Sequence, residues 1–512
     1  MVAPLHLMKG VDPRTRNGLI IGGGILLALW IGVSIAGGKL GLAGLAALGS
    51  LAAVLLWSRL IRLETALLGF LLAGYLIGNR GFAQIMPVAP IPLLLGEAVL
   101  AITGLIVLVQ AAFRQEFPWR KDGLNHVLLL LLALGCARMI IDFRVHGFVA
   151  VRDFATLYYI AFFFIAQAVS ADPRERSWLG TIFVGAASAL PFVTILFQRY
   201  TEFFVGSLTL DGIPVIFMKD DLAATFLLAG LFPLLASGSN RRWRWLGAGI
   251  GGVALLVGFA LLSRAAIVGF AVAAAFALLG RERRWVRVAC VSLLAGLVAA
   301  ALLSWGQGTP WRESRGYALY EHIASIGDLD GTRSYVGSAS ADSGDNNRFR
   351  LVWWGAITER VIDENPVFGL GFGYDLSRDF VSAYEGVGDD FAVRSPHSIV
   401  FTVLGRTGFL GLTLFLVLVG LMIARTRTAA KAARARLEGA ARALSWWCAC
   451  WVILISACFG VVLENPMGAV VFWILLGLAH ASTKAVTEAS AAGEVEETRD
   501  PTLQRAQEPA MR

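Results

Sequence analysis

The feature that most constrains the fold of this chain is a series of apolar runs, many of them about 20 residues long. A helix of about 20 mainly apolar residues crosses the hydrocarbon core of a bilayer, which is about 30 Å thick. Hydrophobic residues make up 57% of the chain and charged residues 16%, whereas charged residues approach about a quarter of a soluble domain. The pattern excludes an ordinary soluble globule and predicts an all-α polytopic membrane protein.

The apolar runs predict about 12 to 14 transmembrane helices, because several runs are short or closely joined. They lie near 18–37, 40–57, 63–78, 92–112, 124–141, 148–169, 178–197, 222–236, 245–262, 265–280, 285–304, 398–424, 443–463 and 467–483. No internal repeat of fixed period is visible. An inverted repeat would be too weak to see by eye, so a transporter stays open as an alternative.

Positive charge predicts the orientation of these helices. Lys and Arg gather in alternate connections: Arg59 and Arg62; Arg114, Arg120 and Lys121; Arg174 and Arg176; Arg241, Arg242 and Arg244; Arg281, Arg283, Arg284 and Arg287; Arg425, Arg427, Lys431, Arg434, Arg436 and Arg442. Because positively charged connections face the cytoplasm, both termini are expected there, with an uncleaved first span. The net charge of +8 therefore reflects topology, and no nucleic-acid partner is predicted.

The chain divides into four predicted parts: an N-terminal helix bundle of about 11 spans (1–304), a large outward-facing loop over the membrane interface (305–396), C-terminal transmembrane helices (397–483) and a disordered cytoplasmic tail (484–512). The tail has no apolar period. Inside the loop, 314–329 and 348–363 have helical character. Asn365-Pro366 should end the second helix, because proline disfavours helical backbone in the residue before it.

The cysteines predict neither a metal site nor a disulfide framework. They show no Cys-x-x-Cys spacing and all lie in or beside apolar helices, outside the large loop. They are Cys136, Cys290, Cys448, Cys450 and Cys458.

Arg264 is the first candidate functional residue, because it lies between two apolar helices with almost no linker. A guanidinium at that depth is costly and needs an anionic partner. That partner is either a substrate, a lipid headgroup, or an acid such as Asp220 or Asp221.

Three arginines of the outer loop are candidates for binding phosphate, because the planar guanidinium matches phosphate oxygens two at a time. Arg348 and Arg350 are two residues apart on a predicted helix, so only one is expected to reach a site. Arg394 precedes the re-entry into the membrane, and contact with a lipid headgroup is an equal alternative for it.

His397 is the candidate general base. It lies where the outer loop meets a span, and an unperturbed imidazole titrates near neutral pH, so it can accept a proton from a hydroxyl. A lone histidine is more often structural. The remaining histidines have no comparable polar company: His6, His126, His146, His322 and His480.

The glycine run 369–373, with Gly371 at its centre, resembles a nucleotide-binding loop only superficially, because no strand precedes it and no helix opens on it. Its amides are candidates for phosphate contact, and a tight interfacial turn is the favoured alternative.

Arg406 lies deeper in the following span. It either lines a cavity or pairs with a buried acid such as Glu97, and Arg152 and Asp153 are expected to neutralise each other.

Four elements, in order along the chain, carry a resemblance. They are Ser263-Arg264 opening a span, Arg350 four residues ahead of Trp354, Asn365-Pro366-Val367-Phe368-Gly369-Leu370-Gly371, and Pro396-His397-Ser398 followed by Gly408 and Gly411. Together with the large outer loop, they resemble the O-antigen ligase and polymerase family of bacterial membrane glycosyltransferases. Lys219-Asp220-Asp221 is similar to a looser element of that family. Members usually carry Asn where this chain has Ser398, and often where it has Asp221.

The resemblance implies a bacterial inner-membrane enzyme of surface polysaccharide or lipopolysaccharide biosynthesis, which uses no metal or cofactor. Such enzymes move a glycan from an undecaprenyl-diphosphate carrier to an acceptor hydroxyl on the outer face. In this chain Arg264 and Arg350 would neutralise the diphosphate and His397 would be the base, with inversion at the anomeric carbon. Arg348, Arg394, Arg406, Asp221 and Gly371 complete the expected substrate-binding set.

The acceptor stays open between lipid A–core, another lipid-linked glycan and a protein hydroxyl, and the oligomeric state is not predicted. The alternatives from other classes are a transporter for a small anion or polyisoprenoid, with Arg264 and Arg406 as relay charges, and a non-catalytic scaffold of an envelope assembly complex.

Overall fold

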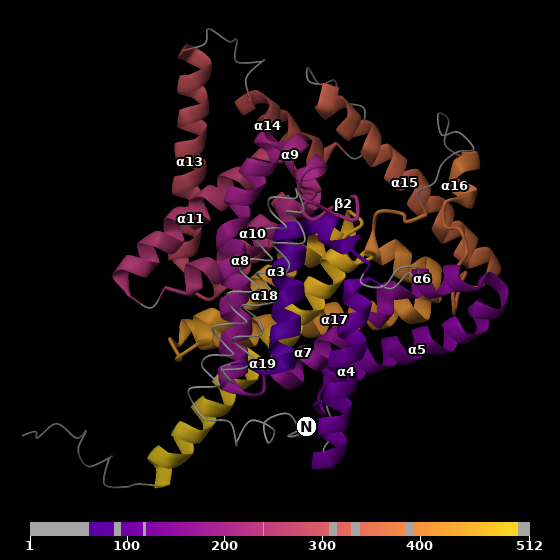
Figure 1. Ribbon diagram of the computed structural model, residues 1–512, viewed down its shortest axis with the longest axis horizontal. Coiled ribbons are helices and arrows are strands. Elements are labelled where there is room, and N and C mark those ends of the chain that lie inside the picture. The colour runs from indigo at the N-terminus through magenta and orange to yellow at the C-terminus, as the bar shows by residue number, and fades with distance from the viewer. Residues whose placement is uncertain are drawn as a thin grey trace, which may run out of the picture.

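The computed structural model describes residues 61–86, 94–115, 119–238, 240–306, 315–328, 338–383 and 394–499. The spans predicted at 18–37 and 40–57 lie outside these residues. The described chain is almost entirely helical (Figure 1). Its strands are β1 (Thr209–Leu210) and β2 (Ile213–Pro214), which form one antiparallel hairpin.

The helices before the large loop are α3 (Leu63–Ala83), α4 (Leu95–Arg114), α5 (Gly123–His146), α6 (Phe148–Tyr158), α7 (Ala161–Val169), α8 (Pro173–Arg199), α9 (Thr201–Gly206), α10 (Asp220–Ala236), α11 (Arg241–Ala260), α12 (Arg264–Leu279) and α13 (Arg283–Gly306). The loop holds α14 (Arg315–Ala324), the 3-10 helix η3 (Ser325–Gly327), α15 (Ser338–Glu364) and α16 (Arg378–Ala383). The chain continues through α17 (Ile399–Arg434), α18 (Ala440–Cys458) and α19 (Pro466–Arg499).

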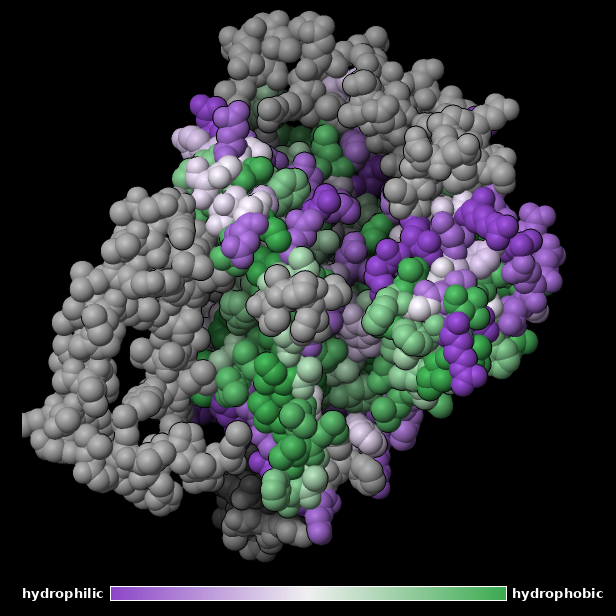
Figure 2. Space-filling model, turned by 45° about the vertical axis from the view of Figure 1, so that its right-hand side comes forward, coloured by the Kyte–Doolittle hydropathy of each residue, from purple (hydrophilic) through white to green (hydrophobic). Residues whose placement is uncertain are grey.

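Among the described residues, ten helical segments are long and apolar enough to cross a membrane, and α12 is a shorter apolar helix. This confirms the predicted all-α polytopic membrane protein. In Figure 2, hydrophobic residues cover the lower part of the visible face and hydrophilic residues gather above and to the right. The helices α14, α15 and α16 lie together at one end of the molecule, and the last turns of α19 extend at the other (Figure 1).

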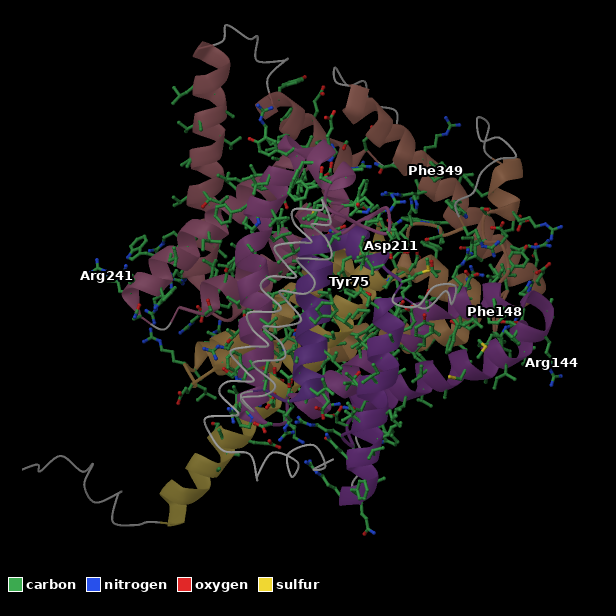
Figure 3. All side chains as sticks on the ribbon, in the orientation of Figure 1. Tyr75, Arg144, Phe148, Asp211, Arg241 and Phe349 are labelled. Carbon is green, nitrogen blue, oxygen red and sulfur yellow. The ribbon has the colours of Figure 1, made fainter. Side chains whose placement is uncertain are left out.

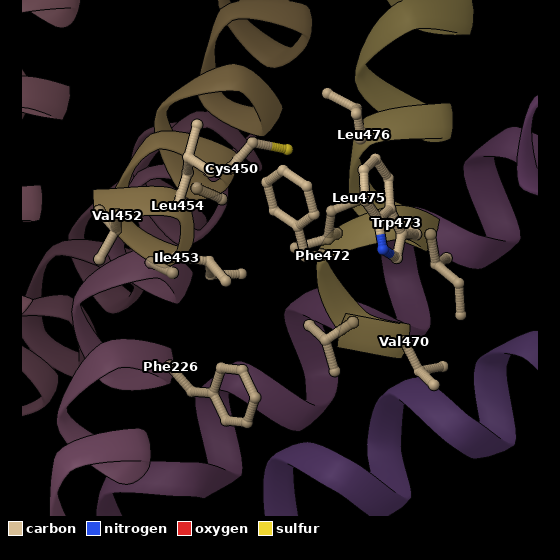
Figure 4. Packing of buried hydrophobic residues seen from close by; sticks show 14 of the residues in the cluster. Phe226, Cys450, Val452, Ile453, Leu454, Val470, Phe472, Trp473, Leu475 and Leu476 are labelled. Atoms are coloured by element: carbon tan, nitrogen blue, oxygen red, sulfur yellow. The ribbon is translucent and has the colours of Figure 1, made fainter. Parts of the chain in front are cut away.

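The core is built around α18 and α19. Phe226 of α10 packs in the same cluster as Cys450 and Phe472, and all are fully buried or nearly so (Figure 4). At the periphery, Leu105 of α4 and Leu302 of α13 are each 64% exposed. Large apolar side chains facing outward at these helices fit a lipid surface, since bilayer tails are as apolar as leucine.

Two features of the fold differ from the predictions. The run 148–169 is broken into α6 and α7. Residues 484–499, expected in a disordered tail, continue α19 as helix. Their alanines and glutamates are strong helix formers, so the absence of an apolar period did not prevent a helix. Residues 500–512 lie outside the described part of the chain.

A third feature is a break inside α17 at Gly408, whose φ is 65°. The segment after α15 packs into this break: the amide of Leu370 donates to the carbonyl of Gly405 at 2.7 Å, and that of Phe409 donates to the carbonyl of Pro366 at 2.8 Å. A Cβ on Gly408 would lie 2.4 Å from the carbonyl oxygen of Val367. Glycine is therefore required, and residues 366–370 are fastened to the N-terminal part of α17.

Candidate functional site

Helix α15 aligns Arg350 with the segment that carries His397. One turn after Arg350, the indole Nε1 of Trp354 donates a hydrogen bond to the carbonyl oxygen of Pro396 at 2.8 Å. The same ring stacks on Phe401 of α17, with centroids 4.7 Å apart. The two loop elements that carry the candidate arginine and histidine are thus joined directly.

His397 itself has a φ of 55°, in the left-handed region that a residue with a Cβ rarely occupies. Its backbone N–H donates to Ser395 Oγ at 3.3 Å, and its ring lies 6.1 Å from that of the buried Trp353. Strained backbone of this kind persists only where the surroundings fix it, and it gathers at functional sites.

Lys219 and Asp221 approach the same region from the start of α10. The side-chain oxygen of Asn79, at the end of the regular part of α3, accepts hydrogen bonds from the backbone amides of Arg80 at 2.9 Å and Lys219 at 3.2 Å. The Lys219 ammonium then lies 3.1 Å from the Asp221 carboxylate. Asp221, one of the acids considered as a partner for Arg264, is therefore paired with Lys219.

Arg264 is the first residue of α12, and Ser263 caps that helix. One guanidinium nitrogen of Arg264 lies 3.4 Å from both the carbonyl and the hydroxyl oxygen of Ser325 in η3. Asn347 of α15 donates to the same carbonyl at 3.1 Å. These contacts hold η3 and α15 close to the first turn of α12.

The three residues predicted as catalytic meet in one pocket of about 380 Å³. Its polar wall is formed by Lys219, Asp221, Ser263, Arg264, His322, Arg350 and His397, and the turn between α18 and α19 closes another side. Arg264 and His397 are far apart in sequence and come together because both lie at the same end of their helices.

The electrostatics of this pocket favour an anion. Burial and, to a smaller extent, the neighbouring Arg264 lower the pKa of Arg350 to about 10, which Asp221 partly offsets. Burial, Arg350 and Lys219 lower the pKa of His397 to about 4, which Asp221 partly offsets. Burial and Arg264 also lower the pKa of His322. Among the described lining residues, three cations therefore face one carboxylate, and both imidazoles are neutral at neutral pH.

One atom of Arg350 is suited to an anionic ligand. Its Nε is buried and makes no hydrogen bond within the described residues. A buried guanidinium N–H without a partner costs free energy, and an anion in the pocket would supply the acceptor.

Arg394 and Arg406 lie in a second, adjacent hollow of about 330 Å³. Arg406 forms an ion pair with Asp153 at 2.8 Å and donates to the carbonyl of Gly371 at 3.0 Å. Arg394 donates to the carbonyl of Gly373 at 2.7 Å. The sequence left two alternatives for Arg406, lining a cavity or pairing with a buried acid. Arg406 does both, and the acid is Asp153. Glu97 instead accepts hydrogen bonds from two tyrosines.

The glycine run has a structural reason of its own. The amide of Phe372 donates to Asp142 at 2.7 Å, and that of Gly373 donates to Asp153 at 3.1 Å. A Cβ on Gly371 (φ 90°) would lie 2.5 Å from the Asp142 carboxylate. The nearby turn from α5 to α6 is marked by Arg144 and Phe148 in Figure 3. The amides of Phe372 and Gly373 already donate to carboxylates. The glycine run is therefore a tight turn, which was the favoured alternative.

Two further outcomes concern single residues. Arg348 is exposed and lines neither hollow, whereas Arg350 does line the pocket, in line with the expectation that only one of them reaches it. His322 was set aside at the level of sequence, yet it lines the pocket and is only 9% exposed. No spacing or motif marks His322, because its position depends on how α14 packs against α13 and α15.

The fold and the site together define a class: a multi-span helical membrane protein with a pocket lined by more cations than carboxylates beneath loop helices. Residues 253–416 match the family model described as O-antigen ligase. This third of the chain holds Arg264, Arg350 and His397. The match supports assignment to the O-antigen ligase and polymerase type of membrane glycosyltransferase. A comparison with curated proteins finds no match.

Proposed function

We propose that this protein transfers a glycan from an undecaprenyl-diphosphate carrier to an acceptor hydroxyl at the outer face of the bacterial inner membrane. The observation that carries this proposal is the convergence of Arg264, Arg350 and His397 on one cationic pocket. The positive-inside pattern supports an outward-facing pocket and cytoplasmic termini.

The two arginines suit the leaving group. When the bond between the anomeric carbon and the diphosphate oxygen breaks, its electron pair goes to that oxygen and negative charge grows there. Preorganised cations stabilise such charge strongly in a site that excludes water. Arg264 and Arg350 both line the pocket, and Arg350 keeps an unpartnered N–H, so the diphosphate oxygens would lie against both guanidinium groups.

His397 suits the acceptor. The acceptor oxygen forms a bond to the anomeric carbon on the face opposite the leaving group, which inverts the configuration, and its proton passes to the neutral imidazole. A bound diphosphate would offset the positive charges of Arg350 and Lys219. It would therefore raise the pKa of His397 from about 4 and make it a stronger base during turnover.

The identity of the acceptor follows from the experiment that tests the proposal. Purified protein in lipid vesicles is supplied with undecaprenyl-diphosphate glycan and, separately, with lipid A–core, a second lipid-linked glycan or a serine-containing protein. The account expects a product with inverted linkage for one acceptor. A ligase, a polymerase and a protein O-oligosaccharyltransferase are then distinguished by which acceptor is used.

The decisive variant is His397→Ala, with His126→Ala as a matched control because His126 is exposed on α5. Loss of a general base costs about 10²- to 10⁴-fold in rate. We expect that loss for His397→Ala and none for His126→Ala, with equal membrane insertion. Undiminished transfer by His397→Ala would remove the proposed base.

A further inference from the structure

Glu464 makes contacts that lead to His397, although it lies beyond the matched region 253–416. It belongs to the turn between α18 and α19. One of its carboxylate oxygens accepts a hydrogen bond from Ser395 Oγ and the other accepts one from Thr402 Oγ1. Ser395 Oγ in turn accepts the backbone N–H of His397. An unbroken chain of hydrogen bonds therefore runs from the Glu464 carboxylate to the His397 backbone.

We infer that Glu464 is a positioning residue that holds His397 in its productive conformation by bracing the segment 395–402 from the α18–α19 turn. This inference deepens the proposed function and rests on it for the role of His397. Glu464 acts through Ser395 and does not contact the transferred group.

The conformation of His397 explains why a brace is needed. A φ of 55° in a residue with a Cβ is unfavourable and requires the surroundings to fix it. Trp354 of α15 holds the Pro396 carbonyl on one side. Glu464 holds the flanking hydroxyls of Ser395 and Thr402 on the other. The segment that carries His397 thus has two anchors, Trp354 from before it in the sequence and Glu464 from after it.

The carboxylate is suited to this task only when it is ionised. As a carboxylate it accepts at both oxygens, whereas the protonated acid turns one oxygen into a donor. The charged groups that face it are Arg406 of α17, Lys219 before α10 and Asp153 of α6. Burial is the largest influence and raises the pKa of Glu464 to about 7. The brace should therefore weaken as the pH falls below neutral.

Glu464→Gln tests this role, because the amide keeps the shape of the side chain but cannot titrate. Glu438→Gln is the matched control, since Glu438 is exposed in the α17–α18 connection. In the wild type, kcat should rise as the pH rises through about 7. In Glu464→Gln this rise of kcat with pH should disappear. Its kcat at pH 8 should fall about 10- to 100-fold, as for residues that orient a functional group. The KM for the lipid-linked glycan should change less than about twofold, and Glu438→Gln should behave as the wild type.

Ser395→Ala is the second variant and removes only one hydroxyl, so it serves if Glu464→Gln does not fold. It should lower kcat with KM unchanged, and combining the two substitutions should add little to the larger single effect, because both interrupt one chain of hydrogen bonds. Wild-type kcat in both single variants would overturn the inference.

Hydrogen–deuterium exchange of the purified protein gives a readout that does not need the transfer activity. Peptides covering 394–402 should exchange faster in Glu464→Gln and Ser395→Ala than in the wild type, while peptides of α5 should not change. Unchanged exchange at 394–402 would contradict the brace even if transfer were lost. Faster exchange, with no transfer by the wild-type protein, would leave the brace intact and refute the proposed function.

Discussion

Asp153 forms ion pairs with Arg152, Arg394 and Arg406. Arg406 and Arg152 differ in burial, and this difference permits a sharp test of the buried network beside the pocket. Arg406 lies 2.8 Å from the Asp153 carboxylate, with side-chain exposures of 6% and 9%. Arg152 lies 3.2 Å from the same carboxylate but is 62% exposed. We therefore compare Asp153→Asn with Arg152→Gln.

The expected magnitudes follow from burial. Asp153→Asn keeps the shape of the side chain and its acceptor for the Gly373 amide, but leaves the buried Arg406 charge uncompensated. Removing one partner of a buried ion pair costs about 3–5 kcal/mol. Arg152→Gln removes an exposed pair, which contributes about 0–1 kcal/mol.

The assay is reversible unfolding of the purified protein in mixed micelles, with an increasing fraction of denaturing detergent. We expect the free energy of unfolding of Asp153→Asn to fall by at least about 2 kcal/mol more than that of Arg152→Gln. Equal effects, or a cost below about 1 kcal/mol for Asp153→Asn, would refute the reasoning, because the Arg406 charge would then be compensated without Asp153.

Three further predictions follow from individual contacts. Arg350→Lys should lower glycan transfer at least about tenfold, because the unpartnered guanidinium N–H is lost, whereas Arg348→Lys should leave the rate unchanged. Gly371→Ala should lower the free energy of unfolding by about 1–3 kcal/mol, because Gly371 has a positive φ and its new Cβ would meet the Asp142 carboxylate. The control Gly355→Ala should be neutral or stabilising by up to about 1 kcal/mol, because the space around its new Cβ is open. Because the folded protein lowers the pKa of His397 from 6.5 to about 4, stability should be lost as the pH falls through that window, and the unfolding midpoint of His397→Gln should depend less on pH there.

The sequence was sufficient for the positions of most helices, because a span in lipid must be both apolar and internally hydrogen-bonded. It also placed Arg264 and His397 at the same end of their helices, since charge alternation sets the depth of each residue. Arg350 followed from a resemblance, and its separation from Arg348 followed from helical spacing.

The remainder of the site depends on packing that hydropathy does not record. The break at Gly408 lies inside a continuous apolar run, and only the backbone of residues 366–370 packed against it makes the break visible. Glu464 reaches Ser395 because α17, α18 and α19 pack together. His322 reaches the pocket because α14 packs against α13 and α15. None of these pairings has a period or spacing that a single sequence displays.

The central claim is that Arg264 and Arg350 bind the diphosphate, whereas His397 accepts the proton of the acceptor. Equilibrium binding of undecaprenyl diphosphate to the purified protein tests this claim most directly. Arg264→Ala and Arg350→Ala should each weaken binding about tenfold or more, because each removes a guanidinium that we propose contacts the diphosphate. His397→Ala should bind as tightly as the wild type while transferring glycan about 10²- to 10⁴-fold more slowly. Wild-type affinity in both arginine variants, or an equal loss of affinity in His397→Ala, would contradict the account.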